Sequence, residues 1–151
     1  MQNERPRGMS LVELLVVLAI VGGLASLALP SYRSYVLRAG RVEARTALLS
    51  LAAAQEKFYL KCRTYAAAVD AAQPESCSPA RLRFAATTER GYYAIGVTSA
   101  DTEAWVATAT RNAGTAQRRD AACRVFELTS SGTKSARDDA GAPATRECWD
   151  R

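Results

Sequence analysis

Two sets of residues in this chain of 151 amino acids could do chemistry: a glutamate at the start of an apolar run, and four cysteines. The chain has no histidine, which excludes Ser-His-Asp and Cys-His nucleophile pairs, HExxH zinc sites and histidine general bases. It also lacks the glycine-rich GxGxxG and GxxxxGK loops that cradle nucleotide phosphates. Because nothing assembles a nucleophile with a base, we expect no enzyme, no catalytic residue and no cofactor.

The glutamate is Glu13. Leu14–Leu29 carries no charge, and Leu11–Leu29 is interrupted only by Glu13 and Ser26. As a helix, Leu11–Leu29 would be about 28 Å long, close to the thickness of a bilayer core. An unpaired carboxylate costs about 2.5–3.5 kcal/mol at the membrane centre and less near its edge. We therefore expect a cationic partner for Glu13, and an α-amino group freed by proteolysis just upstream is the nearest candidate.

Three other interpretations of this segment stay open. It could be a secretory signal peptide, with Arg5 and Arg7 before the apolar run and a cleavage site after Ala28. It could be a simple membrane anchor, in which those arginines favour a cytoplasmic N-terminus. Ser10 and Glu13 also fit a helix capping box, which would not prevent a second role for the carboxylate.

After Pro30 the pattern becomes amphipathic, and a helix is predicted over residues 9–61. Pro30 should kink this helix, and Gly40 is a second soft point. Three arginines share one face and are expected to meet lipid headgroups or neighbouring subunits: Arg38, Arg41 and Arg45. A second face is expected to pack on a core and carries the apolar residues Val36, Ala39, Val42, Leu49, Ala52 or Ala53, and Tyr59 or Leu60.

The rest of the chain has β character. Residues 63–80 look like a loop, whereas residues 92–98, 105–110 and 124–129 are rich in aromatic or β-branched side chains and are bounded by turn residues. A three- or four-stranded antiparallel sheet packed on the amphipathic half of the helix would give an α+β fold.

The four cysteines allow three pairings, and spacing favours Cys62 with Cys77 and Cys123 with Cys148. The first bridge would close a loop worth about 3 kcal/mol in the chain-entropy model. A metal site would need closely spaced ligand pairs such as CxxC, so no metal is expected. Structural disulfides would place this part of the chain outside the cytoplasm.

The chain is basic, with a net charge of +5 and a pI of about 9.3, but the charge is uneven. Residues 62–151 hold 12 basic and 11 acidic side chains, so most of the excess lies in the first 61 residues. DNA binding would need a basic patch in the second part. Five arginines could converge to form it, against a nearly neutral background: Arg81, Arg83, Arg90, Arg118 and Arg119.

The run from Gly8 to Leu14 (GMSLVEL), after a short basic leader and before an apolar segment, resembles the N-terminus of type IV prepilins. The resemblance implies that a membrane peptidase cuts between Gly8 and Met9 and methylates the new N-terminus. Met9 stands where that family most often has Phe. The resemblance also implies that Glu13 neutralises the N-terminal amine of a neighbouring subunit, and Pro30 falls where these helices usually carry a proline.

The cysteine-bounded ending, with Cys148 followed by Trp149, is similar to PilE-type minor pilins of the type IVa class. This implies a leader (1–8), a hydrophobic assembly helix (9–32) and a periplasmic or extracellular head (33–151). The expected function is that of a pilus subunit used for motility or adhesion, anchored in the inner membrane before assembly. The implied partners are other pilins, the prepilin peptidase and methyltransferase, and the assembly machinery of the inner membrane.

Two alternatives accompany this resemblance. A type II secretion pseudopilin shares the N-terminus but more often stabilises its C-terminal region with calcium, for which Asp138 and Asp139 are the only local acidic pair. An adhesin or DNA-uptake pilin would instead bind a ligand through its head. Trp105 and Trp149 are expected to be packing residues rather than ligand contacts.

Overall fold

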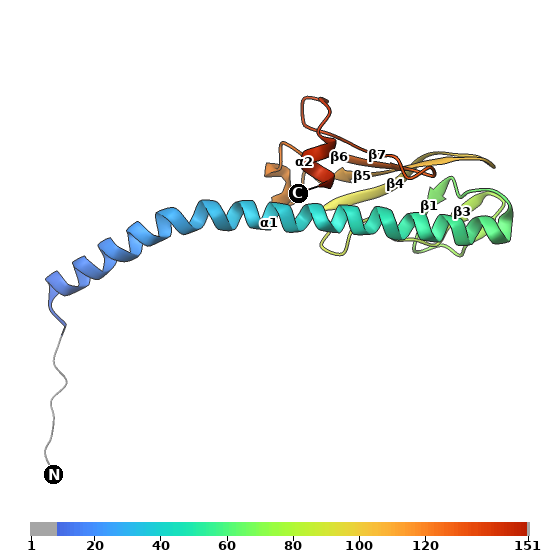
Figure 1. Cartoon of the computed structure of the whole chain (residues 1–151). Helices are drawn as coiled ribbons and strands as arrows, with labels where there is room; N and C mark the ends of the chain where they lie inside the picture. Colours follow the sequence, from blue (N-terminus) through green and yellow to red (C-terminus); the bar gives the residue numbers. More distant parts are fainter. Residues whose placement is uncertain (1–8, 151) are drawn as a thin grey trace, which may run out of the picture. The chain divides into compact units, whose positions relative to one another are not determined.

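The structure, a computed structural model, describes residues 9–150, so Gly8 and the rest of the leader lie outside the described residues (Figure 1). The chain forms two compact units that divide between Val36 and Leu37. Its elements, in chain order, are α1 (Leu11–Cys62), β1 (Ala68–Val69), β2 (Ser76–Cys77), β3 (Ala80–Leu82), β4 (Tyr93–Ala100), β5 (Trp105–Arg111), the 3₁₀ helix η1 (Ala116–Arg119), β6 (Val125–Thr129), β7 (Lys134–Arg137) and α2 (Thr145–Trp149).

Helix α1 agrees closely with the helix predicted over residues 9–61. It has 52 residues and continues through Pro30, which has no N–H to donate to the preceding turn. The Leu14 N–H donates to the Ser10 carbonyl at 3.1 Å, which marks the first helical turn. In the first unit, Ser26 and Ser34 donate their hydroxyls to the carbonyls of Gly23 and Ser31, so these polar groups are satisfied within the helix.

The second unit contains the four-stranded antiparallel sheet, in the order β4-β5-β6-β7. Three of its strands lie where the sequence predicts them. Buried side chains alternate along β5 at Trp105, Ala107 and Ala109, opposite Leu128 and Phe126 on β6. This period of two places one face of the sheet in the core, and the α+β fold predicted from the sequence is confirmed.

The core-facing stripe of α1 differs from the predicted one. Val42 and Leu49 are about half exposed and Leu60 is 76% exposed, so these members of the predicted stripe face outward, whereas Ala52 packs against the core. The buried positions are Gly40, Arg41, Ala44, Leu48, Leu51, Gln55 and Phe58. They recur at three- and four-residue steps, so the helical period was right and the phase was wrong. The error has a physical reason, because three of the buried positions are glycine, arginine and glutamine.

The segment after α1 is not the loop expected over residues 63–80. It contains a small sheet in the order β1-β3-β2, with β1 parallel and β2 antiparallel to β3. Gln55 is fully buried and holds this segment against α1, because its amide donates to the Ala66 carbonyl at 2.8 Å and accepts from the Ala66 N–H at 2.9 Å. The strands were missed because they are only two or three residues long.

Two disulfides cross-link the second unit, and they join the two cysteine pairs that the sequence spacing favours. Cys62 at the end of α1 is bonded to Cys77 in β2, with Cα atoms 5.4 Å apart. Cys123 is bonded to Cys148 in α2, with Cα atoms 5.7 Å apart. Each bridge therefore fixes a segment that has little regular structure of its own.

Candidate functional site

The first candidate site is the exposed apolar surface of α1 in the first unit. Within the described part of the chain, α1 is the one helix long and apolar enough to cross a membrane by length and composition, and none of its apolar window is buried. Large side chains from Met9 to Leu29 are about half to three quarters exposed, among them Leu11 at 73% and Leu27 at 76%. Such a surface is far too apolar to remain in contact with water, so it needs a covering of lipid or protein.

Glu13 lies in the first turn of this helix, where a carboxylate also favours the helix dipole. Its residue is exposed, and across residues 9–150 no ion pair or side-chain hydrogen bond engages it. The predicted capping box with Ser10 is therefore not formed by side-chain bonds here. Glu13 is the charged exception in an otherwise apolar surface.

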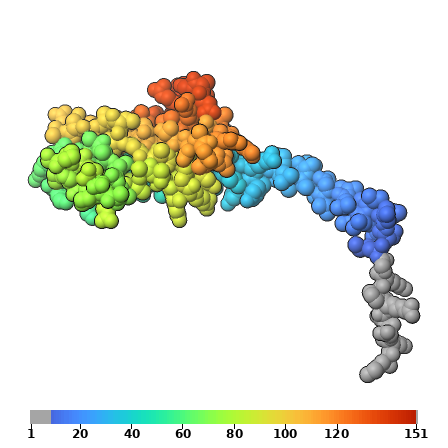
Figure 2. Space-filling view, turned by 180° about the vertical axis from the view of Figure 1, so that it is seen from behind, coloured from blue at the N-terminus to red at the C-terminus, as the bar shows by residue number. Residues whose placement is uncertain are grey.

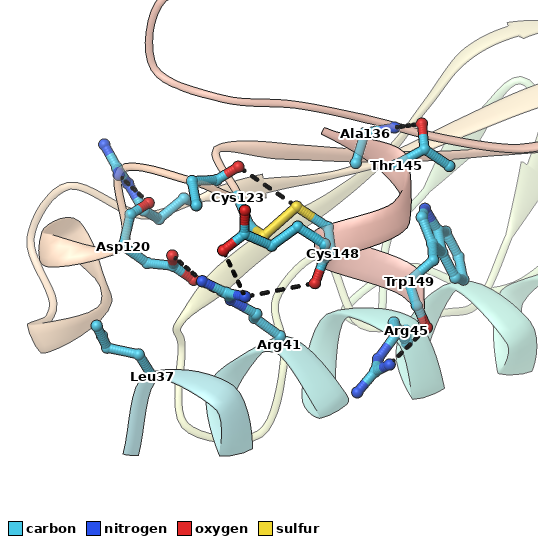
Figure 3. The surroundings of a disulfide bond; sticks show 12 residues. Leu37, Arg41, Arg45, Asp120, Cys123, Ala136, Thr145, Cys148 and Trp149 are labelled. Atoms are coloured by element: carbon cyan, nitrogen blue, oxygen red, sulfur yellow. Dashed lines mark hydrogen bonds and ion pairs between the residues drawn. A yellow bond between two sulfur atoms is a disulfide. The ribbon is translucent and has the colours of Figure 1, made fainter. Parts of the chain in front are cut away.

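The second candidate site is the disulfide-bounded region, residues 120–149, where it packs on α1 within the second unit (Figure 3). Arg41 of α1 forms a two-pronged ion pair with Asp120: Nε donates to Oδ2 at 2.8 Å and Nη2 donates to Oδ1 at 2.7 Å. The side chains are 10% and 2% exposed. The hydrogen bond and charge of Asp120 raise the pKa of Arg41 above its usual range. A second carboxylate, that of Glu147, lies 3.7 Å from Arg41 Nη1 at the surface.

A buried glutamine extends this ion pair. The amide nitrogen of Gln117 lies 3.0 Å from Asp120 Oδ2 and 3.1 Å from both the Tyr93 hydroxyl and the Leu37 carbonyl oxygen. Burial, with the charge of Asp120, raises the pKa of Tyr93 far above its ordinary value, so its phenol stays neutral. The network therefore connects three parts of the fold through polar contacts away from water: α1, β4, and the segment that follows η1.

The short helix α2 closes the same region. Arg45 of α1 donates to the Trp149 carbonyl at 2.6 Å (Figure 3). The Trp149 indole donates to the Ser135 carbonyl at 2.8 Å. The Trp149 ring packs edge-on against Phe126, and Trp105 is 2% exposed. Both tryptophans are thus packing residues, as expected. Of the three arginines predicted to face lipid headgroups and neighbouring subunits, Arg41 is buried and Arg45 is bound to α2, so the prediction is wrong for these two, whereas Arg38 is exposed.

Comparison with known proteins identifies the family. A family model described as "Type IV minor pilin ComP, DNA uptake sequence receptor" matches residues 30–127, nearly two thirds of the chain. The chain belongs to the type IV pilins.

Curated relatives agree with this assignment. The major pilin PilA of Myxococcus xanthus is 42% identical over 57 residues, which are 38% of this chain and 26% of that protein. The major pilin PilE1 of Neisseria gonorrhoeae is 34% identical over 99 residues, 66% of this chain and 42% of that protein. The fimbrial protein EcpC of Eikenella corrodens is 46% identical over 44 residues, 29% of each chain. The matches thus span between about a quarter and two fifths of these relatives.

The five arginines proposed for DNA binding do not form one patch in this pilin. Arg81 lies in β3 of the small sheet and Arg83 directly follows that strand, whereas Arg118 and Arg119 lie on η1, which packs at Gly40. From Gly40 to Gln55, which binds the small sheet's segment, α1 rises by about 22 Å. Figure 2 shows η1 in orange and β3 in yellow-green on different parts of the second unit. Arg90 is instead paired with Glu43 at 3.4 Å.

Four other arginines lie on segments that the backbone joins at the disulfide-bounded end, and we call them the arginine cluster: Arg118, Arg119, Arg124 and Arg137. All four are exposed and, among residues 9–150, none forms an ion pair. The Arg124 N–H donates to the Arg137 carbonyl at 2.9 Å, and the segment after η1 bonds to the segment after β7 through the Asp139 N–H and Ala121 carbonyl at 3.0 Å. Backbone pairing thus gathers residues that are distant in the sequence.

The acidic pair considered as a calcium site has other partners. Asp139 forms an ion pair with Arg111 at 2.9 Å, and Asp138 accepts the Ala142 N–H at 2.8 Å to close a turn. Within the described residues, no three His, Cys, Asp or Glu side chains gather in a group that could hold a metal ion. Asp138 is half-buried in that turn, and Asp139 beside it is exposed.

Gly40 allows η1 to approach α1, and it supplies a testable prediction. A Cβ built on Gly40 would lie 2.7 Å from the Gln117 Cδ, and Gln117 is 1% exposed. Alanine normally stabilises a helix interior by about 1 kcal/mol relative to glycine. Here we expect Gly40→Ala to destabilise the second unit by about 1–3 kcal/mol, because the buried glutamine must be displaced. Urea unfolding of the full chain in detergent, followed by tryptophan fluorescence, measures this change.

Gly22→Ala is the matched control, because nothing lies within 4 Å of its built Cβ. It should leave the unfolding midpoint of the second unit unchanged. A Gly40→Ala chain as stable as the wild type, or more stable, would show that Gln117 does not require glycine at position 40.

Proposed function

We propose that this pilin is a minor subunit of a type IV pilus, held in the inner membrane by α1 before it is incorporated into, or primes, the filament. One observation carries the proposal: an uncovered apolar helix surface with Glu13 at its N-terminal end. In lipid, that surface is covered by acyl chains. In a filament, the same surface packs on the helices of sibling subunits, so a single surface serves both states.

The outward face of α1 in the second unit supports subunit packing. Val42, Leu49 and Leu60 are exposed apolar side chains on a helix whose opposite face is already buried in the core. A face with this composition is suited to contact with another pilin. Motility and adhesion belong to the proposed filament, and the head would lie in the periplasm before assembly and outside the cell afterwards.

The proposed maturation explains why Glu13 is tolerated. Cleavage between Gly8 and Met9 by a prepilin peptidase would free the Met9 amine, which the same enzyme methylates. In a filament, the amine of an incoming subunit would pair with Glu13 of its neighbour in a medium of low dielectric, where either charge alone is heavily penalised. In this scheme residues 1–8 are the leader, 9–32 the assembly helix and 33–151 the head.

Purified filaments test this function. Shearing them from cells and measuring the intact mass of this chain should show the loss of residues 1–8, with the added mass of one methyl group if Met9 is modified. A chain cleaved after Ala28 and absent from filaments would instead support a secretory signal peptide and exclude the assembly scheme.

DNA uptake is a second candidate function, favoured by two observations. The matching family model is described as that of a DNA uptake sequence receptor, and the four arginines of the arginine cluster (Arg118, Arg119, Arg124, Arg137) are exposed on segments that backbone hydrogen bonds join. Duplex DNA binds such clusters through its phosphates, with release of counterions. This cluster replaces the five arginines proposed from the sequence.

The double change Arg118→Ala and Arg119→Ala should weaken duplex binding by the full chain in detergent. It should also lower the slope of log K against log salt by about two, because two phosphate contacts are lost. Fluorescence anisotropy over a salt series measures both quantities. Arg83→Ala, at the other end of the unit, is the matched control. Equal slopes for all three chains would remove the cluster from DNA recognition.

A further inference from the structure

Two tyrosines and an arginine follow the apolar run of α1 in the first unit. Tyr32 is 66% exposed and Tyr35 is 64% exposed, and Arg33 between them is exposed as well. Tyr32 and Tyr35 are three residues apart, so their rings share one side of the helix. We call Tyr32, Arg33 and Tyr35 the collar. No ion pair involves Arg33 within the described residues.

The chemistry of the collar suits a membrane surface. A tyrosine has an apolar ring and a polar hydroxyl, so it prefers the boundary between acyl chains and headgroups. An arginine next to that boundary extends its guanidinium to the phosphates and is attracted by anionic lipids. The neighbouring Ser34 hydroxyl donates to the Ser31 carbonyl at 2.9 Å, so it needs no hydrogen-bond acceptor from the surroundings.

The distance from the collar to Glu13 matches a bilayer. From Glu13 to Tyr32 a helix rises by about 28 Å, against a hydrocarbon core of about 30 Å. When Tyr32 lies at one headgroup boundary, the Glu13 carboxylate therefore reaches the opposite boundary. There its desolvation cost is far below the cost at the bilayer centre.

We propose that Tyr32, Arg33 and Tyr35 bind the headgroups of a phospholipid bilayer that contains anionic lipid, and that they fix the depth of α1 so that Glu13 lies at the opposite headgroup boundary. The collar and Glu13 hold the helix at its two ends, because each is more stable at the headgroup boundary on its own side of the bilayer. Loss of the collar leaves Glu13 unopposed, and the helix then slides toward the Glu13 side. The inference rests on the membrane anchoring in the proposed function and adds the residues that set its depth.

A depth measurement tests the collar. The full chain carrying Val17→Trp is reconstituted in vesicles of phosphatidylcholine and phosphatidylglycerol, with acyl chains brominated at a shallow, a middle or a deep position. Residue 17 lies about 22 Å along the helix from Tyr32, near the middle of the opposite leaflet, so middle bromines should quench most. The chain without Val17→Trp supplies the background from Trp105 and Trp149, both buried in the second unit.

Replacing Tyr32, Arg33 and Tyr35 by alanine in the Val17→Trp chain should move maximal quenching to the shallow bromines, a shift of about 3 Å or more. Arg33→Lys should keep the wild-type depth. Leu60→Ala, at an exposed residue of α1 in the second unit, is the matched control and should also keep it. Arg33→Ala alone should shift the depth only when phosphatidylglycerol is present, which identifies anionic headgroups as the ligand of Arg33.

An unchanged quenching profile in the triple variant, with the chain still inserted, would overturn the proposed role of the collar but would not contradict membrane anchoring by α1. A chain that does not float with the vesicles and is quenched by no lipid would overturn both, because membrane anchoring itself would be wrong.

Discussion

Asp120→Asn is expected to destabilise the second unit by about 3–5 kcal/mol. The change leaves the guanidinium of Arg41 without its close carboxylate in a place where the Arg41 side chain is 10% exposed. An uncompensated buried charge is penalised far more than the intact pair stabilises the fold. The substitution also places an amide nitrogen opposite donors from Arg41 and Gln117. Urea unfolding of the full chain in detergent, with tryptophan fluorescence as the signal, measures the loss.

Two comparisons separate the charge from other effects. Glu147→Gln removes the surface partner of Arg41. The Glu147 side chain is 51% exposed and its carboxylate lies 3.7 Å away, so the change should alter the free energy of unfolding by less than about 1 kcal/mol. Replacing both Arg41 and Asp120 by leucine should cost less than Asp120→Asn, because no charge is then left buried. An Asp120→Asn chain as stable as the wild type would contradict the buried-charge argument.

The outline of the fold was predictable because its signals are local. Trp105, Ala107 and Ala109 alternate with half-exposed residues along β5, and the strand was recognised from this composition. β7 was not among the strands named from the sequence, because it reads Lys-Ser-Ala-Arg and buries Ala136 alone. It is a strand because β6 offers it a partner, with Phe126 opposite Ala136, and this long-range pairing leaves no mark on its composition.

The face of α1 that packs on the core was not predictable for a related reason. Arg41 is buried because Asp120, 79 residues later in the chain, lies 2.7 Å from its guanidinium. Gly40 is buried because Gln117 approaches it. Neither partner can be identified from the helix sequence, where an arginine next to a glycine indicates a solvent-facing position. With Gly40 and Arg41 assigned to the solvent, the sequence pattern assigns other apolar side chains, such as Leu49, to the core, although they point outward.

The candidate sites also differ in whether their signal is local in the sequence or depends on long-range contacts. Glu13 could be predicted because a charge within a long apolar run is evident from the sequence alone. The arginine cluster could be predicted only in part. Arg118 and Arg119 are adjacent in the sequence, whereas Arg124 and Arg137 join them through the pairing of β6 and β7. The arginines selected from the sequence also include Arg81, which lies in the small sheet, and Arg90, which is paired with Glu43.

Glu13→Val is expected to abolish incorporation into filaments while leaving membrane insertion intact. Removing a carboxylate from an apolar helix makes insertion more favourable, so a defect in insertion cannot explain a loss of assembly. In the filament, the amine of the neighbouring subunit would then be buried without a counter-charge. A penalty of about 3 kcal/mol lowers incorporation about a hundredfold, as measured by immunoblotting of sheared filaments against membranes.

Glu13→Gln distinguishes charge from size, since it keeps the shape of the side chain and a hydrogen-bond acceptor. We expect it to fail in assembly like the valine variant, because a neutral amide does not neutralise an ammonium group. Glu56→Gln, at an exposed glutamate of α1 in the second unit, is the matched control and should assemble normally. If Glu13→Val were incorporated at the wild-type level, the amine would need another counter-charge. No other acidic side chain lies between Met9 and Val36, so that charge would have to come from a different subunit or from lipid.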